Sequence, residues 1–130
     1  MPPHSKHRKQ AKHNEELMTH AKELGESGEF SDWVVTIAFY TAVHCVEAML
    51  AIVKPRTRKG NVIEHCLDHS LRNIVVKMVC GIDMHMPYSA LYKYSKMAKY
   101  DCHEPKTYIR VNAEKCLMVV KHECEKLYPA

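Results

Sequence analysis

The feature that most constrains this chain is a long apolar run at residues 32–53. In a helix this run would be apolar on most sides, apart from one polar stripe with spacings of four, four and three positions. The members of the stripe are Thr36, Tyr40, His44 and Glu47. A run of this length could span a bilayer, but Glu47 near its middle would be costly in lipid. We therefore expect the central helix of a soluble bundle, buried on nearly all sides, and no membrane.

The composition favours one all-α domain. The chain has 130 residues, of which 46% are hydrophobic and 26% are charged, as in an ordinary globular protein. That length suits a single domain with a real core. Four glycines and six prolines are too few for the many turns of an all-β fold. We predict a flexible basic N-terminus at residues 1–8 and one domain at residues 9–128.

Apolar residues also recur with a helical period outside the central run. Together with residues 32–53, the predicted helices cover residues 9–24, 61–80, 87–100 and 106–128. Their core-facing residues, in the same order, are Leu17, Ala21 and Leu24; Ile63, Leu67, Leu71, Ile74 and Met78; Tyr88, Leu91, Ser95 and Ala98; and Ile109, Ala113, Cys116, Val120, Cys124 and Leu127. Asn61 is expected to cap its helix and Gly81 to end it. Short connections predict an up-and-down antiparallel helical bundle of four to five helices.

The six cysteines favour a reducing environment. They are Cys45, Cys66, Cys80, Cys102, Cys116 and Cys124. None forms a C-x-x-C pair, and most lie in apolar runs, where a free thiol behaves as a small hydrophobe. Residues 1–12 are basic and lack the apolar stretch of a signal peptide. We expect free thiols and a cytoplasmic protein.

The polar stripe of the central helix is the first candidate for chemistry. It sets an imidazole (His44) beside a carboxylate (Glu47) and a phenol (Tyr40). Such a set can move protons or hold a phosphate or a base. Alternatively, it forms an internal hydrogen-bond network that fixes the register of the helix.

A second set lies in the predicted helix at residues 61–80. His65, His69 and Arg72 follow each other at spacings of four and three, on the side opposite its predicted core residues. The histidine pair has a metal-ligand spacing, but the glutamate of H-E-x-x-H is absent, and a third ligand would have to come from Cys102 or His103. We expect no metal and no cofactor. The set is interpreted as a cationic face, with an ordinary solvated surface as the alternative.

Two further segments are rich in positive charge. The stretch KPRTRKG at residues 54–60 has four basic residues in seven, within a chain of net charge +4. At residues 92–100, Lys93, Lys96 and Lys99 alternate with Tyr92, Tyr94 and Tyr100. Clustered cations neutralise phosphates, and interleaved aromatic rings can stack on bases. The alternative is a lysine-rich solvent face. Phosphate-binding and hydrolase motifs such as G-x-x-x-x-G-K-[ST], G-x-G-x-x-G and G-x-S-x-G are absent.

Three segments, taken in order, resemble the HEPN family (higher eukaryotes and prokaryotes nucleotide-binding domain). They read DWVVTIAFYTAVHCVEAMLA, EHCLDHSLR and YSALYKYSKMAKY, and the resemblance extends over residues 30–127. Its most specific part is A-F-Y-x-A-x-H-x-x-E-A at residues 38–48. The resemblance implies an up-and-down bundle, often a homodimer, that acts on RNA or a nucleotide. Many such domains are encoded beside a small nucleotidyltransferase as toxin–antitoxin pairs, so that protein is an expected partner.

Active HEPN ribonucleases carry an arginine, then four to six residues, then a histidine, and they need no metal. The histidine acts on the ribose hydroxyl proton and the arginine steadies the phosphate. By resemblance the catalytic pair here is Lys99 and His103, with Arg58 and His65 as the alternative. The first pair departs from the pattern because only three residues intervene and lysine lacks the bidentate fork of arginine. The second has the right spacing but lies too early in the chain.

For binding of RNA or a nucleotide we predict a broader set of residues. They are Tyr40, His44, Glu47, His69 and Arg72. The rival interpretation, from a different functional class, is a non-catalytic module for protein interaction or dimerisation. In that case the cationic faces only keep the chain soluble or dock a nucleotidyltransferase.

Overall fold

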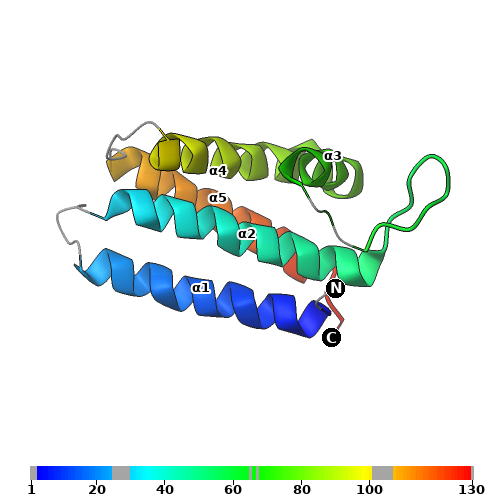
Figure 1. Cartoon of the computed structure of the whole chain (residues 1–130), viewed down its shortest axis with the longest axis horizontal. Helices are drawn as coiled ribbons and strands as arrows, with labels where there is room; N and C mark the ends of the chain where they lie inside the picture. Colours follow the sequence, from blue (N-terminus) through cyan, green and yellow to red (C-terminus); the bar gives the residue numbers. More distant parts are fainter. Residues whose placement is uncertain (1–2, 25–29, 65, 67, 101–106, 130) are drawn as a thin grey trace.

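The computed structural model describes residues 3–24, 30–64, 66, 68–100 and 107–129 (Figure 1). These residues form the helices α1 (His4–Leu24), α2 (Ser31–Val53), α3 (His69–Cys80), α4 (Ile82–Tyr100) and α5 (Thr107–Glu125). The four long helices alternate in direction, with α1 on one side of α2 and α4 on the other, whereas the short α3 is seen nearly end-on. The predicted all-α bundle is confirmed.

α2 occupies the middle of the bundle and packs against α1, α4 and α5. Ala38, Ala42 and Ala48 have no exposed surface, and their small side chains let neighbouring helices approach closely. Among the described residues, α2 is the one helix long and apolar enough to cross a membrane. However, 72% of its most apolar 18-residue stretch is buried inside the molecule. Most of its apolar surface is therefore already used by the other helices.

α1 begins earlier, and faces inward differently, than the sequence predicts. It starts at His4, so the expected flexible segment is wrong from His4 to residue 8. His4 Nδ1 donates to the carbonyl of Ala48 at 2.7 Å, and this bond holds the first turn of α1 on α2. The buried residues of α1 are His7 and Ala11, whereas Leu24 of the predicted core stripe is 75% exposed. The first turn is ordered by polar contacts across the bundle, which hydrophobic periodicity does not report.

The predicted helix at residues 61–80 is half as long as expected. α3 begins only at His69, where the Asp68 side chain accepts a hydrogen bond from the Leu71 amide at 2.7 Å and so acts as the N-cap. Residues 54–63 instead turn back on themselves, with Arg56 and Val62 paired as in an antiparallel hairpin. The predicted cap at Asn61 is therefore wrong. Gly81 does end α3, in a backbone conformation with φ +79° that favours glycine.

α3 also buries the opposite face from the predicted one. Ile74 is 65% exposed, and Leu71 and Met78 are exposed as well, whereas Val75 and Val76 are buried. Arg72 is buried with them, because its partner lies on α2. Of the remaining predicted core residues, Ile63 is buried in the hairpin and residue 67 lies outside the described residues.

The predicted core stripes of the last two helices are largely confirmed. In α4 the buried set includes Tyr88, Leu91 and Ser95, although the helix starts at Ile82 and contains Pro87 instead of beginning there. The corresponding buried residues of α5 are Ala113, Val120 and Cys124. The predicted helix at residues 106–128 ends at Glu125, and Leu127 beyond it is exposed.

The cysteines that the structure describes are free and behave as core residues. Cys45, Cys66 and Cys124 are buried, and Cys80 and Cys116 are half-buried. Burial raises the pKa of the Cys45 thiol to about 12 and that of Cys66 to about 11. Thiols that stay protonated at neutral pH are poor nucleophiles, so the described cysteines are not candidates for catalysis.

Candidate functional site

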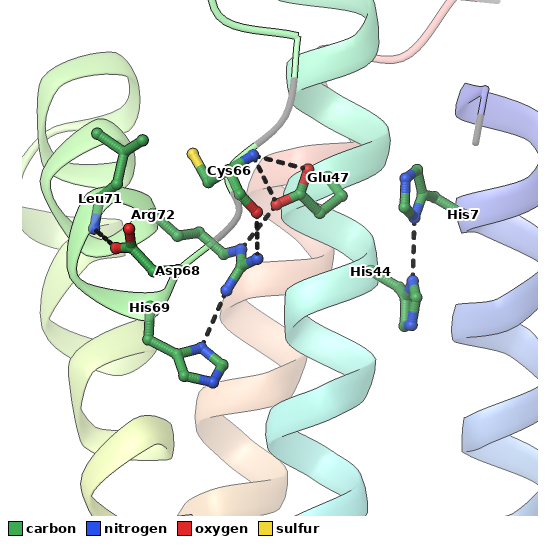
Figure 2. Close-up of polar contacts among 8 residues, drawn as sticks. All are labelled: His7, His44, Glu47, Cys66, Asp68, His69, Leu71 and Arg72. Carbon is green, nitrogen blue, oxygen red and sulfur yellow. Dashed lines mark hydrogen bonds and ion pairs between the residues drawn. The ribbon is translucent and has the colours of Figure 1, made fainter. Parts of the chain in front are cut away.

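A buried ion pair joins α2 to the start of α3 (Figure 2). Arg72 Nε donates to Glu47 Oε1 at 2.8 Å, and the two side chains are only 7% and 5% exposed. The Cys66 amide donates to both carboxylate oxygens of Glu47, at 3.2 and 3.3 Å. Arg72 Nη2 in turn donates to the Cys66 carbonyl at 2.7 Å. The result is a closed network in which each charge has both an ionic and a hydrogen-bonded partner.

This network changes the role predicted for Arg72. Burial by itself disfavours the charged guanidinium, but the hydrogen bond to Glu47 and nearby negative charge outweigh it and raise the pKa of Arg72. Its donors are directed at protein groups, so Arg72 fixes the start of α3 and does not offer a fork to an external phosphate. The expected cationic face of His65, His69 and Arg72 is therefore wrong for Arg72. His65 lies outside the described residues.

Arg72 also determines which nitrogen of His69 carries a proton. Arg72 Nη1 lies 3.0 Å from His69 Nδ1, and a guanidinium can only donate. The Nδ1 atom must therefore accept, which leaves the ring proton on Nε2. Burial, followed by the charges of Arg72 and Lys99, lowers the pKa of His69. At neutral pH His69 is thus a neutral imidazole with one N–H donor, at Nε2.

Lysine side chains lie against tyrosine rings beside His69. Lys99 Nζ donates to the Tyr40 hydroxyl at 2.9 Å and lies 5.1 Å from the centre of the Tyr40 ring. Lys96 Nζ lies 5.4 Å from the centre of the Tyr92 ring. Both lysines are exposed and both tyrosines are half-buried. We call the surface formed by Tyr40, His69, Tyr92, Lys96 and Lys99 the aromatic–cationic face.

Phe39 forms the floor beneath this face. Its buried ring lies 5.4 Å from the ring of Tyr40, 5.3 Å from that of His69 and 5.4 Å from that of Tyr92, measured between centres. The rings of His69 and Tyr92 are themselves 5.2 Å apart. Side chains from α2, α3 and α4 therefore meet in one aromatic cluster, on which the lysines are positioned.

His44 belongs to a different contact. Its Nδ1 lies 3.0 Å from Nδ1 of His7, on the α1 side of α2, whereas Glu47 is directed at α3 (Figure 2). Burial, and then the proximity of His7, lowers the pKa of His44. The predicted stripe Tyr40–His44–Glu47 is thus divided among three neighbours, namely α4, α1 and α3. His44 is not part of the aromatic–cationic face.

Neither predicted catalytic pair is complete within the part of the chain that the structure describes. Lys99 lies in the aromatic–cationic face, but His103 falls outside the described residues. Arg58 is exposed in the hairpin at residues 54–63, and its proposed partner His65 is likewise not described. The roles assigned to these four residues stay predictions.

The largest hollow of the surface lies elsewhere. A groove of about 650 Å³ runs between α1 and α5 and is lined by both cations and carboxylates, including Arg8, Lys12, Glu15 and Lys121. Lys121 Nζ donates to Glu15 Oε2 across it at 3.0 Å. Because opposite charges here neutralise one another, the groove presents no clear preference for an anion. We therefore place the candidate site at the aromatic–cationic face.

Some residues that shape the site were not predicted. Phe39 was noted only as part of the family pattern, and His7 was placed in a flexible segment. Asp68 was also missed as a cap, although an aspartate three positions before a leucine at the start of a helix is a usual N-cap signal. Within the described residues, no group of three or more His, Cys, Asp or Glu side chains is arranged to hold a metal ion.

Comparisons with protein-family models, with curated proteins and with solved structures find no match. Membership of the HEPN family therefore stays a prediction from the sequence. The conclusions that follow are drawn from the residues of this chain.

Proposed function

We propose that this chain is a HEPN-like domain that binds RNA or a nucleotide at the aromatic–cationic face. The observation that carries the proposal is the placement of Lys96 and Lys99 against tyrosine rings, beside the neutral N–H donor of His69. Ammonium groups and an imidazole N–H suit phosphate oxygens, and exposed ring surface suits a base. Stacking of a base on an aromatic side chain contributes about 1–3 kcal/mol.

Tyr40 has a supporting role in this proposal. Its hydroxyl accepts from Lys99, which restricts a long and flexible side chain. Restricting the lysine before binding lowers the entropy that is lost when it contacts a phosphate. Phe39 and the Glu47–Arg72 pair act further back, by holding His69 in place.

Binding is tested with a fluorescein-labelled, 2′-O-methylated oligouridylate, which lacks the hydroxyl proton that an RNase would use. We expect Lys99→Gln to weaken binding and to reduce the slope of log affinity against log salt by about 0.7. Lys12→Gln on α1 is the matched control, because it removes the same charge from an exposed site on a different helix. Equal affinity and slope for the Lys99 variant and the wild type would refute the proposal.

A ribonuclease activity within this function would use His103 as the base and Lys99 as the phosphate contact. Purified wild type, His103→Ala and His65→Ala are incubated with mixed RNA and compared on a gel. Loss of cleavage in one variant identifies the catalytic histidine. Equal background cleavage in all three would exclude the enzyme. A cytoplasmic toxin–antitoxin role with a nucleotidyltransferase partner is tested by co-purification with the protein encoded next to this chain.

The alternative function, a protein-interaction or dimerisation module, is favoured by one apolar surface. A hollow of about 210 Å³ between α1 and α2 is lined by Leu17, Leu24, Phe30, Trp33 and Ile37, together with His20 and Ala21. Trp33 is 60% exposed there. If this surface mediates a homodimer, Trp33→Glu yields a monomer in light scattering, whereas Met118→Glu on exposed α5 surface leaves the dimer intact. A monomeric wild type would refute this alternative.

A further inference from the structure

The basic segment after α2 is an ordered hairpin. The Ile63 amide donates to the Pro55 carbonyl at 2.7 Å, and the Thr57 amide donates to the Asn61 carbonyl at 2.8 Å. At the tip, the Gly60 amide donates to the Thr57 carbonyl at 2.9 Å. Figure 1 shows residues 54–63 projecting beyond the bundle at the end of α2. The backbone of this hairpin is therefore fixed by its own hydrogen bonds.

Positive charge is concentrated on this hairpin. Residues 54–63 include four cations and no acidic residue. Arg56 Nη1 donates to the Gly60 carbonyl at 2.9 Å, so one guanidinium braces the turn. Lys54 lies 3.9 Å from Glu64. Arg58 and Lys59 are exposed at the tip, where an ordered backbone holds their charges close together.

The hairpin is far from the aromatic–cationic face. Tyr40, which accepts from Lys99, and Val53, which ends α2, are 13 positions apart in one continuous helix. At about 1.5 Å per residue this separation is about 20 Å along the helix axis. The hairpin extends beyond that point. A stacked nucleic-acid strand advances about 3.4 Å per nucleotide, so about six nucleotides are needed to cover the distance.

We propose that Arg58 and Lys59 form a second phosphate contact, and that the ligand of this chain is an RNA strand of at least about six nucleotides, not a mononucleotide. The inference rests on the proposed function, because the other end of the strand is held at the aromatic–cationic face. A polyanion with regularly spaced charges matches two separated clusters of cations. The bases of the same strand match the aromatic rings at one of them.

The test compares 2′-O-methylated oligouridylates of two, four, eight and twelve nucleotides by fluorescence anisotropy. For wild type, we expect affinity to rise steeply between four and eight nucleotides. The double variant Arg58→Gln/Lys59→Gln should lose that rise, and its salt slope for the twelve-nucleotide strand should fall by about 1.4, or about 0.7 for each cation removed. Binding of the two-nucleotide ligand should be unchanged. Lys12→Gln/Lys115→Gln, on α1 and α5, is the charge-matched control.

Each alternative outcome identifies what fails. If the two-nucleotide ligand binds and affinity does not depend on length, the hairpin contact is wrong and the aromatic–cationic face stands. If no strand of any length binds, both proposals are wrong. If an acidic peptide of matched charge binds as tightly and with the same dependence on Arg58 and Lys59, the hairpin serves a protein partner and the inference is overturned.

Discussion

α2 is held to its two neighbours by opposite kinds of polar contact. On the α3 side, the carboxylate of Glu47 meets the guanidinium of Arg72, and the Cys66 backbone satisfies both. On the α1 side, the Nδ1 atoms of His44 and His7 lie 3.0 Å apart, where at most one proton can be shared. The first contact joins opposite charges, and the second is sensitive to proton uptake. Burial of polar groups thus gives a permanent link on one side of the helix and a conditional one on the other.

Removing the charge on the α3 side is expected to have the largest effect. Arg72→Met leaves the Glu47 carboxylate buried without its counter-charge, which destabilises a protein by about 3–5 kcal/mol. Urea unfolding measures the change in the free energy of unfolding. Adding Glu47→Gln to Arg72→Met should recover much of the loss, because no charge is then left buried. A loss below about 1 kcal/mol in the single variant would contradict the importance of this pair.

Breaking the α1 side should cost less and should change with pH. His44→Ala removes the partner at Nδ1 of His7, at a cost of about 1–2 kcal/mol. Burial, then His7 and Arg72, lower the pKa of His44 and outweigh the opposing effect of Glu47. The unfolded chain therefore takes up a proton at a higher pH than the folded chain does. The stabilising contribution is complete above a pH of about 6.5 and is lost as the pH falls through the lowered pKa.

This pH dependence separates the two sides of α2. Urea midpoints measured from neutral pH down to about pH 5 should fall for wild type and fall less for His44→Ala. Some dependence should remain in the variant, because the pKa of His69 is also lowered. Identical pH profiles for the two proteins would mean that the histidine pair does not respond to acid.

Loss of the cap at α3 is expected to cost about 1 kcal/mol. Asp68→Ala removes the side-chain acceptor for the Leu71 amide, while Asp68→Asn should retain most of the stability. Because His69 is the next residue, binding of oligouridylate should weaken in Asp68→Ala as well. If stability falls and binding does not, the placement of His69 is not important for the ligand.

The smallest effect on stability is expected at the exposed contact between α2 and α4. Tyr40→Phe removes the acceptor for Lys99 but keeps the ring, so unfolding should change by no more than about 0.5 kcal/mol. Its effect should appear in the affinity for RNA, because Lys99 is then less restricted. A large loss of stability would show that Tyr40 supports the fold more than the site.

Apolar periodicity predicted the helices with a plain core face, such as α2 and α4. It failed for α3, where two faces are apolar and the choice between them is made by Arg72, whose partner Glu47 is 25 residues away. It also failed at His4 and His7, since polar residues near a terminus look flexible unless their partners are known. For the site, residue types were predictable, but the contact of Tyr40 with Lys99 depends on how α4 packs on α2.

The hydrogen bonds donated by Arg72 also determine how this part of the molecule can open. Arg72 holds Glu47, Cys66 and His69 at once, so α3 cannot leave α2 without breaking all of these bonds together. The amides of Cys66 and Leu71 should therefore exchange with deuterium as one cooperative unit and not fray singly. The foot of the basic hairpin and the imidazole of His69 lie at the two ends of that unit. A single local opening would release both proposed RNA contacts in the same event.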